Sequence, residues 1–253
     1  MVNVLTPDDL DYEFDFDFGF GKKNEKKREK KHEQMIRGKT LFTAKDPISA
    51  LTHFIGFWAA LAGMPILLIK ASSDGANLVS MVSLAVFMVS MVLLYGASTA
   101  YHSFTVKPRA GKVLKKIDHM MIFVLIAGSY TPMCTMVLGG ATGLKLLVLI
   151  WSVALLGIVF KAFWVTCPKW VSSVIYITMG WAALLAIGQI YASMALGGFI
   201  LLVMGGVLYS IGGVIYSLKI KDIAPGFGAH EVFHIFVLAG SLCHFLMMIG
   251  YVA

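Results

Sequence analysis

Two histidines near the end of the chain, His230 and His234, have the spacing of a metal site. Residues four apart on a helix lie on one face about one turn apart, so both imidazoles can point at a single ion or a single substrate group. The alternative is that neighbouring carbonyls or water satisfy each ring, because imidazole is also an ordinary hydrogen-bonding group of protein interiors. The rest of the chain must distinguish a shared zinc from this structural alternative.

The composition indicates a polytopic membrane protein. Of the 253 residues 58% are hydrophobic and 14% are charged, whereas soluble domains are about half apolar and about a quarter charged. Seven apolar segments approach the ~20 residues that cross a hydrocarbon core. The segments lie near 47–69, 78–104, 117–138, 144–164, 170–190, 194–218 and 230–252. We therefore predict an all-α fold, a bundle of seven transmembrane helices, in which the division of 171–218 at 189–193 is the least distinct.

The distribution of Lys and Arg predicts the orientation of this bundle. If the N-terminus is cytosolic, 19 of the 21 Lys/Arg fall on the cytosolic side, as the positive-inside rule requires. The sequence thus predicts a cytosolic N-terminus and a C-terminus outside. The net charge of +7 comes from Lys and Arg in the short loops, where they set the orientation of the bundle. We therefore expect no nucleic-acid partner.

Residues 1–45 form a separate tail ahead of the membrane domain, 46–253. The tail carries ten Lys/Arg against nine Asp/Glu, with an acidic-aromatic stretch at 11–21 and a basic run at 22–39. This composition predicts a disordered or partly helical cytosolic tail. The basic run would attract anionic lipid headgroups by roughly 1 kcal/mol per cation near the surface, although a solvated charged helix is the alternative.

Three further features of the spans concern packing. In the sixth segment, the glycine pairs 197–198, 205–206 and 212–213 recur at eight and seven residues and would form one stripe for close helix approach. Pro132 should kink the third segment, leaving carbonyls that need a hydroxyl or water partner. The cysteines have no paired spacing and are predicted to be small core residues, not disulfides: Cys134, Cys167 and Cys243.

Polar residues of three spans should converge at the cytosolic side. His102 closes the second span there, Asp118 opens the third, and His230 and His234 open the seventh. Ser98 lies about 6 Å deeper than His102 on the same helix face. If these spans are neighbours, the five side chains occupy one thin layer near the inner headgroups.

This layer has the residues of a catalytic zinc site. Three imidazoles with an open fourth position are the ligand pattern of zinc that activates water. Asp118 could act through water as a general base or orient a ligand. Ser98 could donate to a developing oxyanion or fix a ligand ring, or it could be a helix-packing hydroxyl.

The other candidate groups carry less weight. His244 lies about 15 Å along the helix axis from His234 and cannot share its ion, whereas His53, about two turns inside the first span, is the rival ligand. His119 points about 100° away from Asp118 and could face headgroups. Glu231 is expected to be a polar partner and not a ligand.

The pieces together resemble the hemolysin III family, the bacterial branch related to progestin and adiponectin Q receptors and, more remotely, alkaline ceramidases. The resemblance covers about 46–252. It rests mainly on Ser98-x3-His102, on Asp118 in the span ending at 127–132, and on His230-Glu-x2-His234. Supporting motifs are 46–56 and Gly205-Gly206-x2-Tyr209-x2-Gly212-x3-Tyr216. It implies a bacterial plasma-membrane protein with an intramembrane zinc on His102, His230 and His234, with Asp118 and Ser98 beside it. One departure is visible, because Asp46 and Ser49 stand where the family often has Glu and Asn.

Three functional hypotheses follow. The relatives that are lipid amide hydrolases imply zinc-dependent hydrolysis of a membrane lipid amide or ester. The family's name implies a pore-forming, lytic protein instead, although no continuous polar stripe crosses any segment. The receptor relatives imply a non-enzymatic lipid sensor with a structural zinc.

Overall fold

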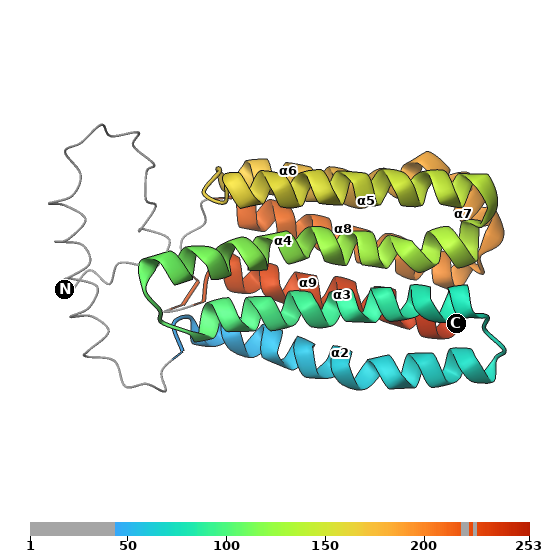
Figure 1. Cartoon of the computed structure of the whole chain (residues 1–253), viewed down its shortest axis with the longest axis horizontal. Helices are drawn as coiled ribbons and strands as arrows, with labels where there is room; N and C mark the ends of the chain where they lie inside the picture. Colours follow the sequence, from blue (N-terminus) through green and yellow to red (C-terminus); the bar gives the residue numbers. More distant parts are fainter. Residues whose placement is uncertain (1–43, 219–222, 225–226) are drawn as a thin grey trace, which may run out of the picture.

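A computed structural model describes residues 44–218, 223–224 and 227–253 as a bundle of long, roughly parallel and antiparallel helices (Figure 1). The predicted tail at 1–45 lies outside the described residues except for residues 44 and 45, and its basic run at 22–39 lies outside them entirely. Seven helical segments of the described chain are long and apolar enough to cross a membrane, which confirms the predicted fold class. The elements are α2 (Pro47–Ser73), α3 (Leu78–Ser103), α4 (Pro108–Pro132) continued by η2 (Met133–Leu138), α5 (Gly140–Phe163), α6 (Lys169–Gly180) continued by η3 (Trp181–Ala186) and α7 (Ile187–Ser193), α8 (Leu196–Ser217), and α9 (Ala229–Met247) continued by η4 (Met248–Val252).

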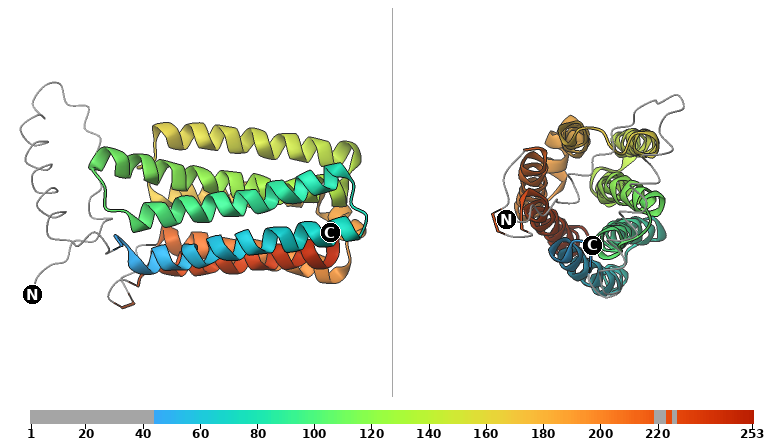
Figure 2. Two further views of the ribbon diagram at one scale, coloured as in Figure 1. Left: turned by 60° about the horizontal axis from the view of Figure 1, so that its bottom comes forward. Right: turned by 90° about the vertical axis from the view of Figure 1, so that its left-hand side faces the viewer.

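The helices form a closed ring, which Figure 2 shows along the bundle axis. Each span packs beside the next one in the chain, and α9 closes the ring by packing against both α8 and α2. Because α2, α3 and α9 are therefore neighbours, the start of α2, the end of α3 and the start of α9 meet at one end of the bundle. This is the arrangement that the proposed polar layer requires.

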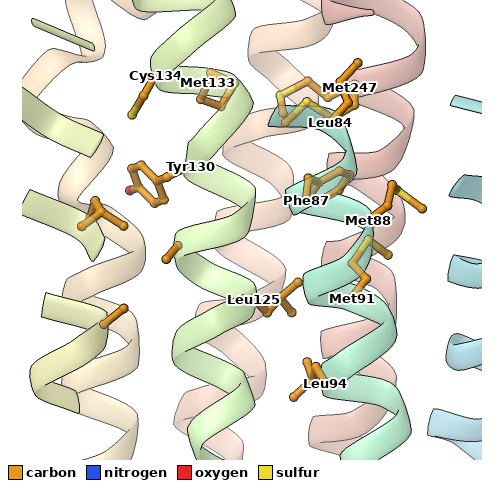
Figure 3. Packing of buried hydrophobic residues seen from close by; sticks show 14 of the residues in the cluster. Leu84, Phe87, Met88, Met91, Leu94, Leu125, Tyr130, Met133, Cys134 and Met247 are labelled. Atoms are coloured by element: carbon orange, nitrogen blue, oxygen red, sulfur yellow. The ribbon is translucent and has the colours of Figure 1, made fainter. Parts of the chain in front are cut away.

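The interior is filled by large apolar side chains, many of them from α3 and α4 (Figure 3). Leu84, Phe87 and Met88 of α3 are fully buried and belong to the same cluster as Leu125 of α4, which Figure 3 shows at the level of Met91. Apolar side chains on the outer surface of the spans stay exposed, as expected where lipid replaces water. The three cysteines are free and buried, in agreement with the sequence prediction.

Two helix boundaries differ from the prediction. The third span begins at Pro108 and not near 117, because Pro is well suited to the first turn of a helix and the helix extends beyond its apolar part. The fifth and sixth spans are separated between Ser193 and Leu196, a few residues after the predicted division. The fifth span also contains the 3-10 turn η3, which apolar periodicity did not indicate.

Pro132 interrupts the regular helix as expected. The α-helical part of the third span ends there and η2 continues it as a π-helix, a common response to a lost backbone hydrogen bond. Hydroxyls bond to carbonyls in the preceding turn: Ser129 Oγ donates to Leu125 O at 2.8 Å and Thr131 Oγ1 donates to Ala127 O at 2.9 Å.

The glycines of α8 allow close packing, but not as one stripe: Gly205 and Gly212 face α9, whereas Gly206 faces Trp181 of η3 and Gly213 faces Ile177 of α6. A Cβ atom at Gly205 would meet the ring of His244 and the Gly240 carbonyl, and one at Gly212 would meet Phe236. The close approach therefore depends on the absence of side chains at these positions.

Replacing Gly157 by Ala tests the tightest side-chain contact between α4 and α5. A Cβ atom there would collide with the ring of Phe123, which is fully buried and has little room to move. We expect the free energy of unfolding to fall by about 1–3 kcal/mol, measured as a lower thermal midpoint in detergent. Gly188→Ala is the matched control, since nothing lies within 4 Å of a Cβ atom there. Equal destabilisation by both variants would contradict the packing argument.

Candidate metal centre

Three histidines from two helices meet at the end of the bundle where α2 begins. His102 lies in the last turn of α3, and His230 and His234 lie in the first two turns of α9. One ring nitrogen of each lies within 4.8 Å of the others, and the Nε2 atoms of His102 and His230 are 3.2 Å apart. His102 and His234 are 3% and 2% exposed, so two of the three imidazoles are withdrawn from the surface.

The three imidazoles could hold a metal ion. Two ligand nitrogens at 2.0–2.1 Å from a tetrahedral zinc are separated by about 3.3 Å, close to the 3.2 Å between His102 and His230. Three imidazoles leave one coordination position for another ligand. The three histidines of this chain can therefore hold a metal ion with one position open.

Asp46 orients His102 from the start of α2. Its carboxylate Oδ2 lies 2.9 Å from His102 Nδ1, and its backbone N–H donates to the His102 carbonyl at 2.9 Å. Asp at a helix N-cap usually accepts from its own helix, but this side chain makes no such bond and is directed to His102 instead. The contact leaves His102 Nε2 facing the other two histidines, the arrangement in which a carboxylate sets the tautomer of a metal-binding imidazole.

The charge environment favours the ionised form of Asp46. Burial raises the pKa of this carboxyl, but the hydrogen bond with His102 and the nearby cations outweigh it, and the pKa lies below its ordinary value. An ionised carboxylate is the better acceptor for the His102 Nδ1–H.

The first two turns of α2 also orient His234. His234 Nδ1 lies 3.3 Å from the Ser49 carbonyl and 3.2 Å from Thr52 Oγ1. A carbonyl can only accept, so Nδ1 carries the proton in the Ser49 contact and Nε2 keeps its lone pair. His102 and His234 therefore use the same pattern, with Nδ1 held by the start of α2.

Glu231 fixes the start of α9. Its Oε2 accepts from the backbone N–H of Gly228 at 2.9 Å and its Oε1 accepts from Ser49 Oγ at 2.7 Å. Glu231 does not belong to the group whose ligand atoms converge, in agreement with its predicted part as a polar partner. By joining α9 to α2, it helps to hold His230 and His234 toward His102.

Asp118 and Ser98 lie beside the histidines. Both side chains are buried, at 6% and 1% exposure, and the Asp118 carboxylate is near enough to His102 and to the Ser98 hydroxyl to interact with both. Ser98 Oγ makes no hydrogen bond of standard geometry with the described residues. Asp118 and Ser98 therefore lie near His102, while the parts predicted for them in the chemistry of the centre stay predictions.

The other histidines behave differently. His53 stacks on His234, with ring centroids 3.7 Å apart, and is outside the convergent group. His119 is 8% exposed, its Nδ1 lies 3.5 Å from Asp118 Oδ2, and Tyr176 of α6 donates to its carbonyl at 3.0 Å; it is thus buried and does not face headgroups, as the sequence had suggested it could. His244 packs near α8, with Nε2 3.4 Å from the Leu202 carbonyl.

Sequence reasoning missed the contribution of the α2 start. It treated Asp46 and Ser49 only as departures from the family pattern, although both contact residues of the centre. An Asp-Pro pair before an apolar span signals a helix start, but only the ring closure of α2 onto α3 and α9 reveals that its side chains turn to the histidines.

Replacing Asp46 by Ala tests this orientation. Without the carboxylate, the His102 ring loses its Nδ1 partner, and we expect metal affinity to fall about 10- to 100-fold, measured by competition with a chromogenic chelator. Asp46→Glu keeps the charge and should recover most of the affinity. Unchanged affinity in Asp46→Ala would show that His102 does not depend on this contact.

Comparisons with known proteins place the chain among relatives of similar length. A family model described as "Haemolysin-III related" matches residues 42–245. A protein named "Hemolysin-3 homolog" from Bacillus subtilis (strain 168) is 42% identical over 212 residues, 83% of this chain and 96% of its own length. "Hemolysin-3" of Bacillus cereus is 38% identical over 213 residues, 84% of this chain and 94% of its own length. With the seven apolar helices, these relatives identify an integral protein of the bacterial plasma membrane.

Proposed function

The chain belongs to the haemolysin-III-related family, and we propose that it is a zinc-dependent membrane hydrolase of a lipid amide or ester. The observation that carries this proposal is the convergence of His102, His230 and His234 next to a buried carboxylate. A purely structural metal would more often have a closed ligand shell, whereas three imidazoles and a neighbouring acid are typical of a centre that handles water.

Each polar group would have a distinct part in hydrolysis. The three histidines would hold zinc, which supplies Lewis acidity that polarises a carbonyl and makes water a nucleophile near neutral pH. The Asp118 carboxylate would accept a proton from the attacking water and return it to the leaving nitrogen or oxygen. Ser98 Oγ, which has no partner of standard geometry in the described chain, would donate to the developing oxyanion.

The location suits a lipid substrate. The predicted orientation places the centre near the cytosolic leaflet, where the amide or ester linkages of lipids lie at the edge of the hydrocarbon region. A substrate could remain in the bilayer while its linkage reaches the histidines. Its acyl chains would then stay among apolar side chains.

A pore-forming protein is the second candidate, because both relatives carry the name of a hemolysin. The bundle of one chain offers little support for an aqueous path, since Leu84, Phe87 and Met88 fill its interior and are fully buried. A pore would therefore need several copies of the chain. The third candidate, a lipid sensor, would use the same centre without chemistry.

Metal analysis followed by a lipid screen tests the proposal. The full chain, purified in mild detergent without chelators, should contain about one zinc. Incubation with vesicles containing lipid amides and esters should yield a hydrolysis product by mass spectrometry, and zinc removal should stop it. A folded, metal-free protein would contradict the proposal.

The remaining outcomes separate the other candidates. Saturable lipid binding with no product on long incubation would identify a sensor. A steady conductance in planar bilayers that survives zinc removal would identify a pore.

A further inference from the structure

A lysine, a cysteine and a serine form a buried cluster where α5 meets α6, apart from the metal centre. Lys161 Nζ, in the last turn of α5, donates to Cys167 Sγ at 3.1 Å and to Ser172 Oγ at 2.5 Å. The sulfur and the serine oxygen are 3.3 Å apart, so the three polar atoms form a triangle. Lys161 is 0% exposed and Cys167 is 7% exposed.

Lys161 has no carboxylate partner in the described part of the chain. Its other cation contacts are the rings of Phe160 and Tyr176, with Nζ 5.8 and 6.0 Å from their centroids, near the limit at which such contacts are favourable. A buried ammonium without a counter-charge is costly. The thiol of Cys167 is the acidic group within hydrogen-bond distance, and the pair can become neutral by sharing one proton.

The position of the proton within the pair decides which atom is the nucleophile. When nitrogen holds the proton, sulfur is a thiolate, the nucleophilic form of cysteine. When sulfur holds it, nitrogen is a free amine. Ser172 Oγ accepts from Nζ and can donate to sulfur, so it stabilises either form.

We propose that Lys161 and Cys167 are a peroxide-sensitive modification site that closes to a sulfur–nitrogen cross-link. In the first step the Cys167 sulfur attacks hydrogen peroxide, an S–O bond forms, the O–O bond breaks, and the departing hydroxide takes the shared proton as water. Sulfur is oxidised by two electrons to a sulfenic acid and peroxide is reduced. In the second step Lys161 Nζ attacks sulfur, an S–N bond forms, the S–O bond breaks, and a second water leaves.

The geometry favours the cross-link over further oxidation. The amine is already in contact with the sulfur at 3.1 Å, whereas a second peroxide must diffuse in from outside, so the amine meets the sulfenic acid first. The closed bond would tie the end of α5 to the loop at 164–168. Cys134 and Cys243 have no hydrogen bond to a lysine in the described residues, so they are internal controls.

Peptide mapping of peroxide-treated protein tests the proposal. The full chain in detergent is exposed to stepwise hydrogen peroxide, free thiols are alkylated, and the protein is digested with trypsin. We expect cleavage after Lys161 to be lost and the fragment that contains Lys161 and Cys167 to be lighter by two hydrogen atoms, with both changes reversed by dithiothreitol. Cys167 carried to sulfinic acid, with Lys161 still cleaved, would overturn the proposal.

Two substitutions separate the functions of the lysine. Lys161→Arg keeps the positive charge but has no comparable nucleophile, so Cys167 should still oxidise and no S–N bond should form. Lys161→Met removes the proton partner as well, and oxidation of Cys167 should slow by roughly tenfold. If Cys167 reacts at the wild-type rate in a folded Lys161→Met protein, the pair has no chemical function. If neither variant folds, the tryptic peptide map of the peroxide-treated wild-type protein decides whether the cross-link forms.

Discussion

We expect the double variant His230→Ala/His234→Ala to lose its metal when it is purified as the full chain. A single remaining imidazole on His102 cannot compete with water and buffer, so the zinc content should fall to about a tenth of the wild-type value or less. The measurement is metal analysis after gel filtration in detergent, with the thermal midpoint recorded alongside. Since binding stabilises the folded state, the midpoint should become insensitive to added zinc.

His244→Ala is the matched control for this loss. It removes a third imidazole from the same helix, at a position that packs against Gly205 of α8 and lies outside the convergent group. It should change stability and leave the zinc content near one per chain. Equal metal content in the double variant and wild type would place any zinc elsewhere and remove the basis of the proposed hydrolysis.

The hydropathy of this sequence is sufficient to predict the seven spans, because in lipid each helix forms all of its backbone hydrogen bonds within itself. The ends are harder to predict. Pro108 begins α4 among cationic residues, where composition suggests a loop, because a helix can continue into the headgroup region once its apolar part is anchored. The turn η3 was also missed, since its sequence, Trp181–Ala186, is as apolar as the helices on either side.

The candidate centre could be predicted as far as residue types and topology allow. His102 and the His230–His234 pair are at the ends of spans on one predicted side, so a shared depth follows from counting residues. The contacts of Asp46 with His102 and of Ser49 with Glu231 do not follow, because they depend on which helices are neighbours in the ring. Tertiary packing, and not local sequence, directs the Asp46 carboxylate away from its own helix.

Replacing Asp118 by Asn is expected to lower turnover of the lipid amide or ester by about 10²–10⁴-fold, the usual contribution of a positioned general base or acid. The amide has nearly the same shape, but it cannot accept and return a proton. Asp118 is not one of the three convergent ligands, so the zinc content should stay the same. The measurement is product formation by mass spectrometry on metal-matched samples.

Asp74→Asn is the matched control for this prediction, since Asp74 is an exposed acid at the other end of the bundle, paired with Lys70 at 2.6 Å. A surface ion pair contributes about 0–1 kcal/mol, and turnover should stay at the wild-type level. If Asp118→Asn binds zinc and turns over lipid at the wild-type rate, the proton must be carried by another group. His119 would then be the next candidate, because its Nδ1 is 3.5 Å from the same carboxylate.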